Sequence, residues 1–247
     1  MEGIYPAISG SLLQEKRLEV LANNLANINT IGFKEDRSVF ETYIMGNVSS
    51  YQPLAPTRII PEEAYAVFTG INTVFSQGEL RYTRNPLDLA IDGNGFFVTE
   101  TPQGKAYTRK GNFTINKEGL LVTQEGLSVL GRGGTITIRG SQVIIDNEGN
   151  ILVDDKRVDT ISVVDFPKPY PLQKIGDSLF VLNNTEIEEI TPTGITIQQG
   201  YLELSNVQAT KAMVEMIDIL RAYEAYQKII QSFNDEALKT INEVGKP

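Results

Sequence analysis

Residues 206–244 read NVQATKAMVEMIDILRAYEAYQKIIQSFNDEALKTINEV, the longest periodic segment of the chain. Apolar side chains recur in it at alternating steps of three and four, the heptad pattern of a helix that packs on another helix. Counted from Met213, the positions are Met213, Met216, Leu220, Tyr223, Gln227, Ile230, Asn234, Ala237 and Ile241. We predict one helix over 206–244, about 58 Å long, with Asn206 or Ser205 as its N-cap.

A second helical pattern begins the chain, over residues 4–28. Its apolar stripe consists of Ile4, Ile8, Leu18, Leu21, Leu25 and Ile28. Gly32 then offers a left-handed exit. This helix would be about 37 Å long, too short to cover the C-terminal one. We therefore expect the two ends to pack as a coiled-coil-like core whose surplus apolar face is covered by other copies or other proteins.

The middle of the chain reads as β structure. Between residues 71 and 199, short β-branched runs alternate with turn signals such as 92–95 and 146–150, where Gly and Asn supply positive φ. This pattern predicts a mostly-β domain of meanders, a small barrel or a sandwich. Residues 46–70 are polar and Pro-rich and predict an extended connector. The fold class is thus mixed α and β, with 1–45 and 200–247 as the helical core.

Composition excludes several functions. The chain has no Cys and no His, so disulfides, thiolate metal sites and Ser-His-Asp or Cys-His catalysis are impossible. Its net charge of −9 argues against nucleic acid as a partner. No apolar run reaches the roughly 18–20 residues of a membrane helix, and residues 1–25 do not form a secretory signal peptide. We expect no enzyme activity, no cofactor, no metal site and no membrane insertion.

One string stands out, NNLANINTIGFK at residues 23–34, because four Asn in seven residues is unusual for a helix end. Buried or interfacial amides of this kind can fix register. Further strings of note are FSQGEL at 75–80, NPLDLAIDGNGFF at 85–97, YTRKGNF at 107–113, and SNV, MVEMI and RAYE beginning at 205, 213 and 221.

Together, these strings resemble the flagellar rod, hook and hook-associated protein family, in the same order and over nearly the whole chain. The resemblance implies an axial subunit that stacks helically around a central channel, with the terminal helices as the inner tube. It also implies self-assembly, contact with other rod and hook proteins, and export by the flagellar type III apparatus without a cleaved signal peptide. The location would be the rod that spans the periplasm.

The candidate site residues are interfacial. Those expected to pack in the helical core and the assembly are Leu18, Leu21, Leu25, Ile28, Met213, Met216, Ile217, Leu220, Tyr223 and Ile230. Those expected to fix register, or to carry the family motifs, are Asn23, Asn24, Asn27, Asn29, Gly32, Phe33, Ser205, Asn206, Arg221, Glu224, Gln227 and Asn234. Tyr223 and Tyr226 are candidate partner anchors, and core packing is equally expected for one of them.

Within the family, length leaves the larger proximal-rod subunit and the distal-rod subunit. Residues 130–136, LGRGGTI, and 78–83 are slightly closer to the proximal member, whereas the helix-end string is closer to the distal one. Two other classes stay open. A secreted wall- or glycan-binding module draws slight support from Tyr82, Tyr107 and Tyr170. A carboxylate hydrolase is the weakest alternative.

Overall fold

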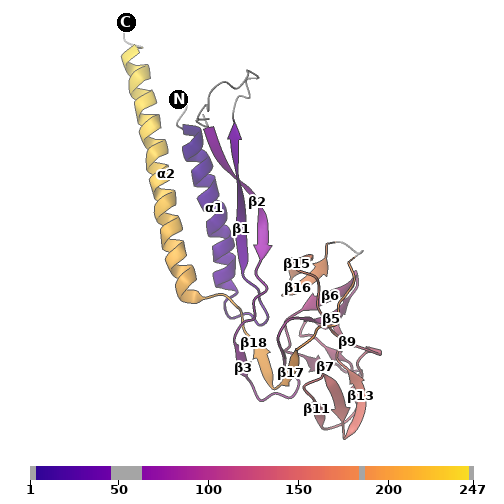
Figure 1. The fold of residues 1–247 in the computed structure, drawn as a ribbon. Coiled ribbons are helices and arrows are strands. Elements are labelled where there is room, and N and C mark those ends of the chain that lie inside the picture. The colour runs from indigo at the N-terminus through magenta and orange to yellow at the C-terminus, as the bar shows by residue number, and fades with distance from the viewer. Residues whose placement is uncertain (1–3, 46–62, 184–186, 245–247) are drawn as a thin grey trace, which may run out of the picture. The chain divides into compact units, whose positions relative to one another are not determined.

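The computed structural model describes residues 4–45, 63–183 and 187–244, and for 42–45, 63–66 and 241–244 it describes the backbone alone. An N-terminal helix, a mostly-β central region and a C-terminal helix make up a mixed α and β chain (Figure 1). The chain divides into two compact units. Unit 1 holds residues 1–26, 36–74 and 208–247, and unit 2 holds 27–35 and 75–207.

Unit 1 contains two helices and a hairpin. Helix α1 spans Ile4–Ala26 and helix α2 spans Ala209–Val244. Strands β1 (Asp36–Met45) and β2 (Glu63–Thr73) pair antiparallel. Helix α1 packs on α2 and on both strands, so that it lies between α2 and the hairpin (Figure 1). Both helices form close to their predicted bounds because their apolar periodicity is helical throughout.

Unit 2 consists of short strands. They are β3 (Leu80–Tyr82), β4 (Leu89–Asp92), β5 (Phe96–Thr101), β6 (Gly104–Thr108), β7 (Thr114–Ile115), β8 (Leu121–Val122), β9 (Ser128–Gly131), β10 (Gly134–Thr135), β11 (Val143–Ile145), β12 (Asn150–Val153), β13 (Lys156–Thr160), β14 (Val163–Val164), β15 (Leu172–Gly176), β16 (Leu179–Leu182), β17 (Thr196–Gln199) and β18 (Tyr201–Glu203). The largest sheet has the order β15-β16-β6-β5-β9-β8-β7, with β10 on β9 and β14 on β5. The remaining strands form β11-β12-β13, β17-β4 and β18-β3.

The described strands form open sheets with no closed barrel among them, because the strand pairs break into separate short ladders. The connector expected over 46–70 lies outside the described residues from 46 to 62, and residues 63–70 belong to β2.

The turn predicted at residues 146–150 forms in unit 2. The Asp146 carboxylate accepts hydrogen bonds from the backbone N–H groups of Glu148 and Asn150, at 3.0 and 2.9 Å. Gly149 follows at φ +84°, a conformation that side-chain-bearing residues rarely adopt. This local hydrogen bonding reverses the chain between β11 and β12, and the segment is a turn.

Two buried clusters form the core of unit 2. One gathers Leu89, Ile91, Phe97, Phe113, Leu121, Val129, Ile136, Ile138, Ile145, Ile151, Val153, Ile161 and Ile197. The other gathers Phe96, Val98, Tyr107, Val164, Phe166, Leu172 and Phe180. Phe96 and Phe97 are neighbours on β5 and point to opposite faces of the strand, so each cluster receives one ring.

Candidate assembly site

Helices α1 and α2 run antiparallel and touch closely at one point. Near one end, Arg17 of α1 pairs with Glu215 of α2 at 3.3 Å, and farther along Gln227 donates to the Ser11 hydroxyl at 3.1 Å. Next to the second contact, Gly10 lies against the Tyr226 ring. A Cβ at Gly10 would come within 2.5 Å of that ring. Gly10 therefore allows the close approach, and Tyr226 packs within the helix pair.

The buried face of α2 coincides with only part of the predicted stripe. Ala212 and Ile219 are 5% and 2% exposed, whereas Met213 and Leu220 are 53% and 40% exposed. Met213 and Leu220, which were expected to pack on α1, are therefore exposed in the single chain. Both sets recur at helical spacing, and the small Ala212 permits closer contact between the helices than Met213 would.

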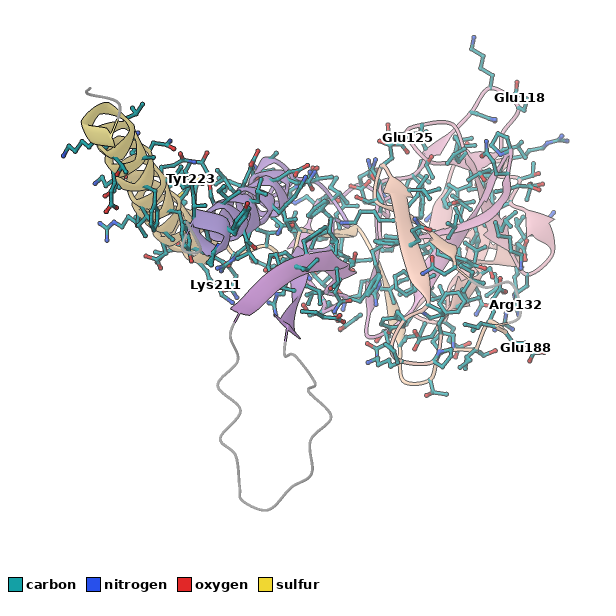
Figure 2. All side chains as sticks on the ribbon, turned by 90° about the horizontal axis from the view of Figure 1, so that it is seen from above. Glu118, Glu125, Arg132, Glu188, Lys211 and Tyr223 are labelled. Carbon is teal, nitrogen blue, oxygen red and sulfur yellow. The ribbon has the colours of Figure 1, made fainter. Side chains whose placement is uncertain are left out.

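Some of the other predicted helix residues are buried or partly buried, and the rest are exposed to solvent. Leu21 is buried, and partly buried are Leu18, Leu25, Ile28, Met216, Tyr223, Gln227 and Ile230. Exposed are Arg221, Glu224, Asn234 and Ile217, the last at 50%. The side-chain view shows Tyr223 and Lys211 on α2 among many other side chains that extend from this helix (Figure 2).

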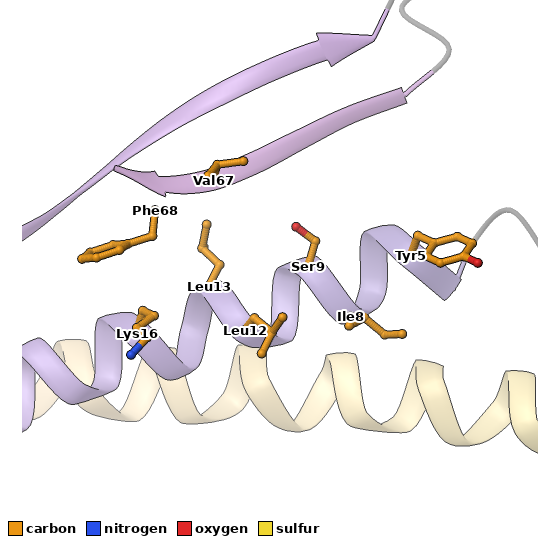
Figure 3. Close-up of a pocket in the computed structure, with 8 residues that line it drawn as sticks. All are labelled: Tyr5, Ile8, Ser9, Leu12, Leu13, Lys16, Val67 and Phe68. Carbon is orange, nitrogen blue, oxygen red and sulfur yellow. The ribbon is translucent and has the colours of Figure 1, made fainter. Parts of the chain in front are cut away.

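A groove lies between α1 and β2. It encloses about 390 Å³ and is lined by Tyr5, Ile8, Ser9, Leu12, Leu13, Lys16, Val67 and Phe68 (Figure 3). Of these, Tyr5, Ile8 and Leu12 are 63%, 40% and 57% exposed. Exposed apolar side chains gathered in one place usually mark an interaction surface. We call this set the α1 patch, and Met213, Ile217 and Leu220 the α2 patch.

The asparagine string has one clear structural member. The Asn24 amide donates to the Asp36 carbonyl at 2.7 Å, and its oxygen accepts the Asp36 N–H at 2.9 Å. This reciprocal pair ties the last turn of α1 to the start of β1. Asn27 accepts a hydrogen bond from the Thr30 hydroxyl at 3.1 Å, whereas Asn23 and Asn29 are exposed.

Gly32 and Phe33 contact other residues of unit 2. Gly32 has φ +66°, and a Cβ there would lie 2.5 Å from the Lys110 backbone nitrogen. Its N–H donates to the Glu203 carbonyl at 2.8 Å. Phe33 is buried, with the Lys174 ammonium 4.1 Å from its ring centroid. Residues 27–35 are therefore fastened into unit 2 immediately after α1 ends.

A buried charge cluster completes this attachment. Lys34 Nζ lies 2.5 Å from Glu203 Oε1, and Arg109 lies 3.1 Å from Glu203 Oε2; the side chains are 0%, 3% and 0% exposed for Lys34, Arg109 and Glu203. Lys34 also donates to the Ser76 carbonyl, and Arg109 to the carbonyls of Ile91 and Gly93. We call these three residues the charge clamp. It joins the segment that enters unit 2 to the strand that leaves it.

The charge clamp holds three charged side chains away from solvent, where an uncompensated charge is costly. Burial lowers the pKa of Lys34 below its usual value, Arg109 lowers it further, and the Glu203 carboxylate opposes both effects. Two cations share one anion, so removal of Glu203 would leave both uncompensated. Sequence reasoning missed this cluster because Lys34 and Glu203 are 169 positions apart.

The C-terminal motif residues also serve unit 2. The Asn206 oxygen accepts the Glu35 N–H at 2.7 Å, and its amide donates to the Ser76 carbonyl at 3.1 Å. The Ser205 hydroxyl accepts the Val207 N–H at 3.3 Å. Helix α2 begins only at Ala209. The expected N-cap at Asn206 or Ser205 was therefore wrong, because both side chains have partners before the helix starts.

Nothing in this arrangement indicates chemistry on a substrate. Across residues 4–45, 63–183 and 187–244, no group of three acidic side chains is placed to hold a metal ion. In the same part of the chain, no helix has the length and apolar character to cross a membrane. What the described residues offer is a helix pair with exposed apolar side chains in unit 1 and a separately packed β unit.

Comparison with known proteins agrees with these features. Residues 4–34 match the family described as flagella basal body rod protein, residues 90–153 the flagellar hook protein FlgE/F/G D1 domain, and residues 198–243 the flagellar basal body rod FlgEFG protein C-terminal family.

Curated relatives match over nearly their full length. The flagellar basal-body rod protein FlgF of Caulobacter vibrioides is 33% identical, with 98% of each chain covered. The rod protein FlgG of Bacillus subtilis is also 33% identical over 98% of each chain, and FlgG of Caulobacter vibrioides is 32% identical over 99% of each. At this similarity and coverage, the chain belongs to the flagellar basal-body rod protein family.

Proposed function

We propose that this chain is a structural subunit of the flagellar basal-body rod and polymerises through its terminal helices. The observation that carries the proposal is the pair of apolar patches on α1 and α2, which the chain's own fold leaves exposed. A monomer would gain nothing from such surfaces, whereas a polymer buries them at every contact. The relatives named as rod proteins support the same reading.

The helices would form a coiled-coil-like core in the assembled rod, together with helices of neighbouring subunits. In this core, Met216, Tyr223 and Ile230 would pack on the chain's own α1, where they are already partly buried. The exposed Met213, Ile217 and Leu220 would contact neighbours. Gln227 would hold register inside the pair through Ser11, and Arg221, Glu224 and Asn234 would act at the surface.

We further propose a position in the proximal rod, with the distal rod as the alternative. Residues 78–83 and 130–136 support the proximal position through their resemblance to that member. The relatives carry both the FlgF and the FlgG names at similar identity, so they leave this choice to experiment. Its partners would be copies of itself and other rod and hook proteins, after export through the flagellar type III apparatus without cleavage of a signal peptide.

The test is to purify hook–basal bodies from the cell that makes this protein and label them with gold-coupled antibody against the chain. Electron microscopy should show label on the rod, between the inner ring and the outer-membrane ring. Label nearer the inner ring would indicate the proximal rod, and label nearer the outer ring the distal rod. Intact basal bodies without label would refute the proposal and favour a secreted wall-binding module.

A further inference from the structure

Residues 27–35 form a separate segment of unit 2, which we call the strap. The chain leaves unit 1 after residue 26 and returns to unit 1 at residue 36. The base of this excursion is closed inside unit 1 by the two hydrogen bonds between the Asn24 side chain and the Asp36 backbone. The strap could therefore leave unit 2 without breaking the hydrogen bonds that tie α1 to β1.

The apolar core of unit 2 is complete without the strap. Its two buried clusters draw all their members from residue 75 onward. Among the strap residues, all of which the structure describes, Phe33 is the only buried apolar side chain. Polar contacts supply much of the remaining attachment: the Gly32 N–H donates to the Glu203 carbonyl at 2.8 Å, and the Glu35 N–H to the Asn206 side chain at 2.7 Å. Such hydrogen bonds exchange for bonds to water at modest net cost.

Closure of the strap adds an excess cation to the charge clamp. Glu203 Oε2 lies 3.1 Å from the Arg109 guanidinium, so these two buried side chains already form a neutral pair. Lys34 adds a second buried cation, 2.5 Å from Glu203 Oε1. Burial lowers the pKa of Lys34 although the carboxylate acts in the opposite direction, as an excess charge should show. An uncompensated buried charge favours the state in which it returns to water.

Release of the Lys34 ammonium would leave each of its acceptors with another donor. Glu203 Oε1 also accepts the Gly78 N–H at 2.9 Å, and the Ser76 carbonyl also accepts the Asn206 amide at 3.1 Å. Breaking a buried ion pair is usually costly because it leaves a buried group unpaired. Departure of Lys34 avoids that cost.

We infer that the strap is a releasable latch, which detaches from unit 2 while the rest of unit 2 stays folded, and that the excess buried charge of Lys34 sets how easily it does so. The backbone passes between the units after residues 26, 35, 74 and 207. With the strap detached, residues 27–35 become a loop of unit 1, and the passages after 74 and 207 alone still join the units. The latch thus changes how many backbone connections join the two units. It belongs to the single chain and does not depend on the proposed rod function.

Hydrogen exchange of the full chain, followed by nuclear magnetic resonance, tests the release. The Gly32 and Glu35 amides report on the strap, whereas the Leu121 and Ile197 amides, each bonded to a backbone carbonyl and buried in the core, report on unfolding of unit 2. Relative to their intrinsic rates, the strap amides should exchange at least about tenfold faster and with little dependence on urea, as expected for local opening. Equal protection and equal urea dependence of all four amides would overturn the inference.

Lys34→Met tests the role of the charge, because it keeps the length of the side chain and removes the excess cation. Exchange of the Gly32 and Glu35 amides should slow about tenfold, within the range found when buried ionic groups are replaced by apolar ones. The matched control is Lys174→Met. Lys174 donates to the Lys34 carbonyl at 2.8 Å but is partly exposed, so its loss removes a contact without relieving a buried charge and should speed the same exchange. Faster exchange in Lys34→Met, or failure of that variant to fold, would contradict the role of Lys34.

Gly32→Ala provides a chain in which the strap is held open. Gly32 has φ +66°, and an added Cβ would lie 2.5 Å from the Lys110 backbone nitrogen, so the strap cannot seat. Near-ultraviolet circular dichroism and protected Leu121 and Ile197 amides should show that the rest of unit 2 is folded, while the Glu35 amide exchanges as if unprotected. Unfolding of the whole of unit 2 in this variant would mean that the strap is part of its core, and the inference would fail.

Discussion

Units 1 and 2 bury their apolar side chains very differently. Among the described residues, twelve of the seventeen exposed large hydrophobic side chains lie in unit 1, although unit 2 contains more residues. Unit 2 encloses two apolar clusters and pairs its buried charges. Unit 1 buries few large side chains in its helices beyond Val20, Leu21 and Ile219. Unit 2 thus buries most of its large apolar side chains, whereas unit 1 leaves many of them exposed.

The largest effect on stability is expected at the charge clamp of unit 2. Glu203→Gln keeps the side-chain shape but leaves Lys34 and Arg109 buried without their anion. We expect a loss of about 3–5 kcal/mol in the free energy of unfolding of unit 2. Urea unfolding followed by near-ultraviolet circular dichroism would measure it, since most ring–ring contacts among the described residues lie in unit 2.

The matched control is Glu125→Gln. Glu125 also pairs with a lysine, Lys110, but at the surface (Figure 2), so its loss should cost under about 1 kcal/mol. If Glu203→Gln proved no more costly than Glu125→Gln, the clamp would not be what holds unit 2 together.

Ile219 and Ile217 of α2 differ in burial, so their substitutions should have different effects. Ile219 is buried in the helix pair, so Ile219→Ala should cost about 2–5 kcal/mol in the monomer. Ile217 is exposed, so Ile217→Asp should leave unfolding of the monomer nearly unchanged but abolish assembly. Thermal unfolding by far-ultraviolet circular dichroism and the yield of rods in basal bodies would measure the two effects. Normal rods from the Ile217→Asp chain, with unit 2 folded, would contradict the assembly role.

A smaller effect is expected at Gly10. An added methyl group would press on the Tyr226 ring, at a cost of about 1–3 kcal/mol. The better helix propensity of Ala returns up to about 1 kcal/mol. The net loss for Gly10→Ala should therefore be on the order of 1 kcal/mol, measured by thermal unfolding.

The combination with Tyr226→Leu provides the control for Gly10. Removing the ring should make Gly10→Ala neutral or stabilising, because only the propensity gain remains. If the cost of Gly10→Ala stayed the same without the ring, the contact with Tyr226 would not be its cause.

The sequence predicted what is local and missed what is distant. Both helices and the turn at Asp146 follow from short-range patterns, periodicity in one case and side-chain hydrogen bonding in the other. Met213 and Leu220 are exposed although the heptad count included them, because Ala212 and Ile219 fit an apolar stripe equally well. One stripe faces α1 and the other faces outward, and the spacing alone does not distinguish them.

The charge clamp and the β1–β2 hairpin needed the fold. Lys34 and Arg109 carry no local mark that separates a buried cation from a surface one. The partner that decides their role, Glu203, lies far along the chain. Likewise, the Pro-rich stretch after β1 indicated a connector, and nothing local showed that the strands on either side of it pair. The register role expected for the Asn string stays a prediction, and in the structure Asn24 holds the end of α1 to the backbone of Asp36.

The smallest effect concerns alkaline pH and again belongs to unit 2. Burial, followed by a hydrogen bond from its hydroxyl to Asp165, raises the pKa of Tyr170 from 10 to about 12. A pKa raised by folding means that the protonated hydroxyl stabilises the folded state. This stabilisation is complete below the unfolded value of 10 and is lost as the pH rises from 10 to about 12.

Because Tyr170 is partly exposed, we expect a stabilisation of only about 1 kcal/mol. Urea unfolding of unit 2 at about pH 9 and about pH 11.5 should show a smaller loss for Tyr170→Phe than for the natural chain. Tyr82→Phe removes a hydroxyl from an exposed ring and should behave like the natural chain. If Tyr170→Phe lost as much stability as the natural chain over this range, the alkaline sensitivity of unit 2 would have to arise elsewhere, with Tyr107 the next group to examine, since burial and Glu189 raise its pKa as well.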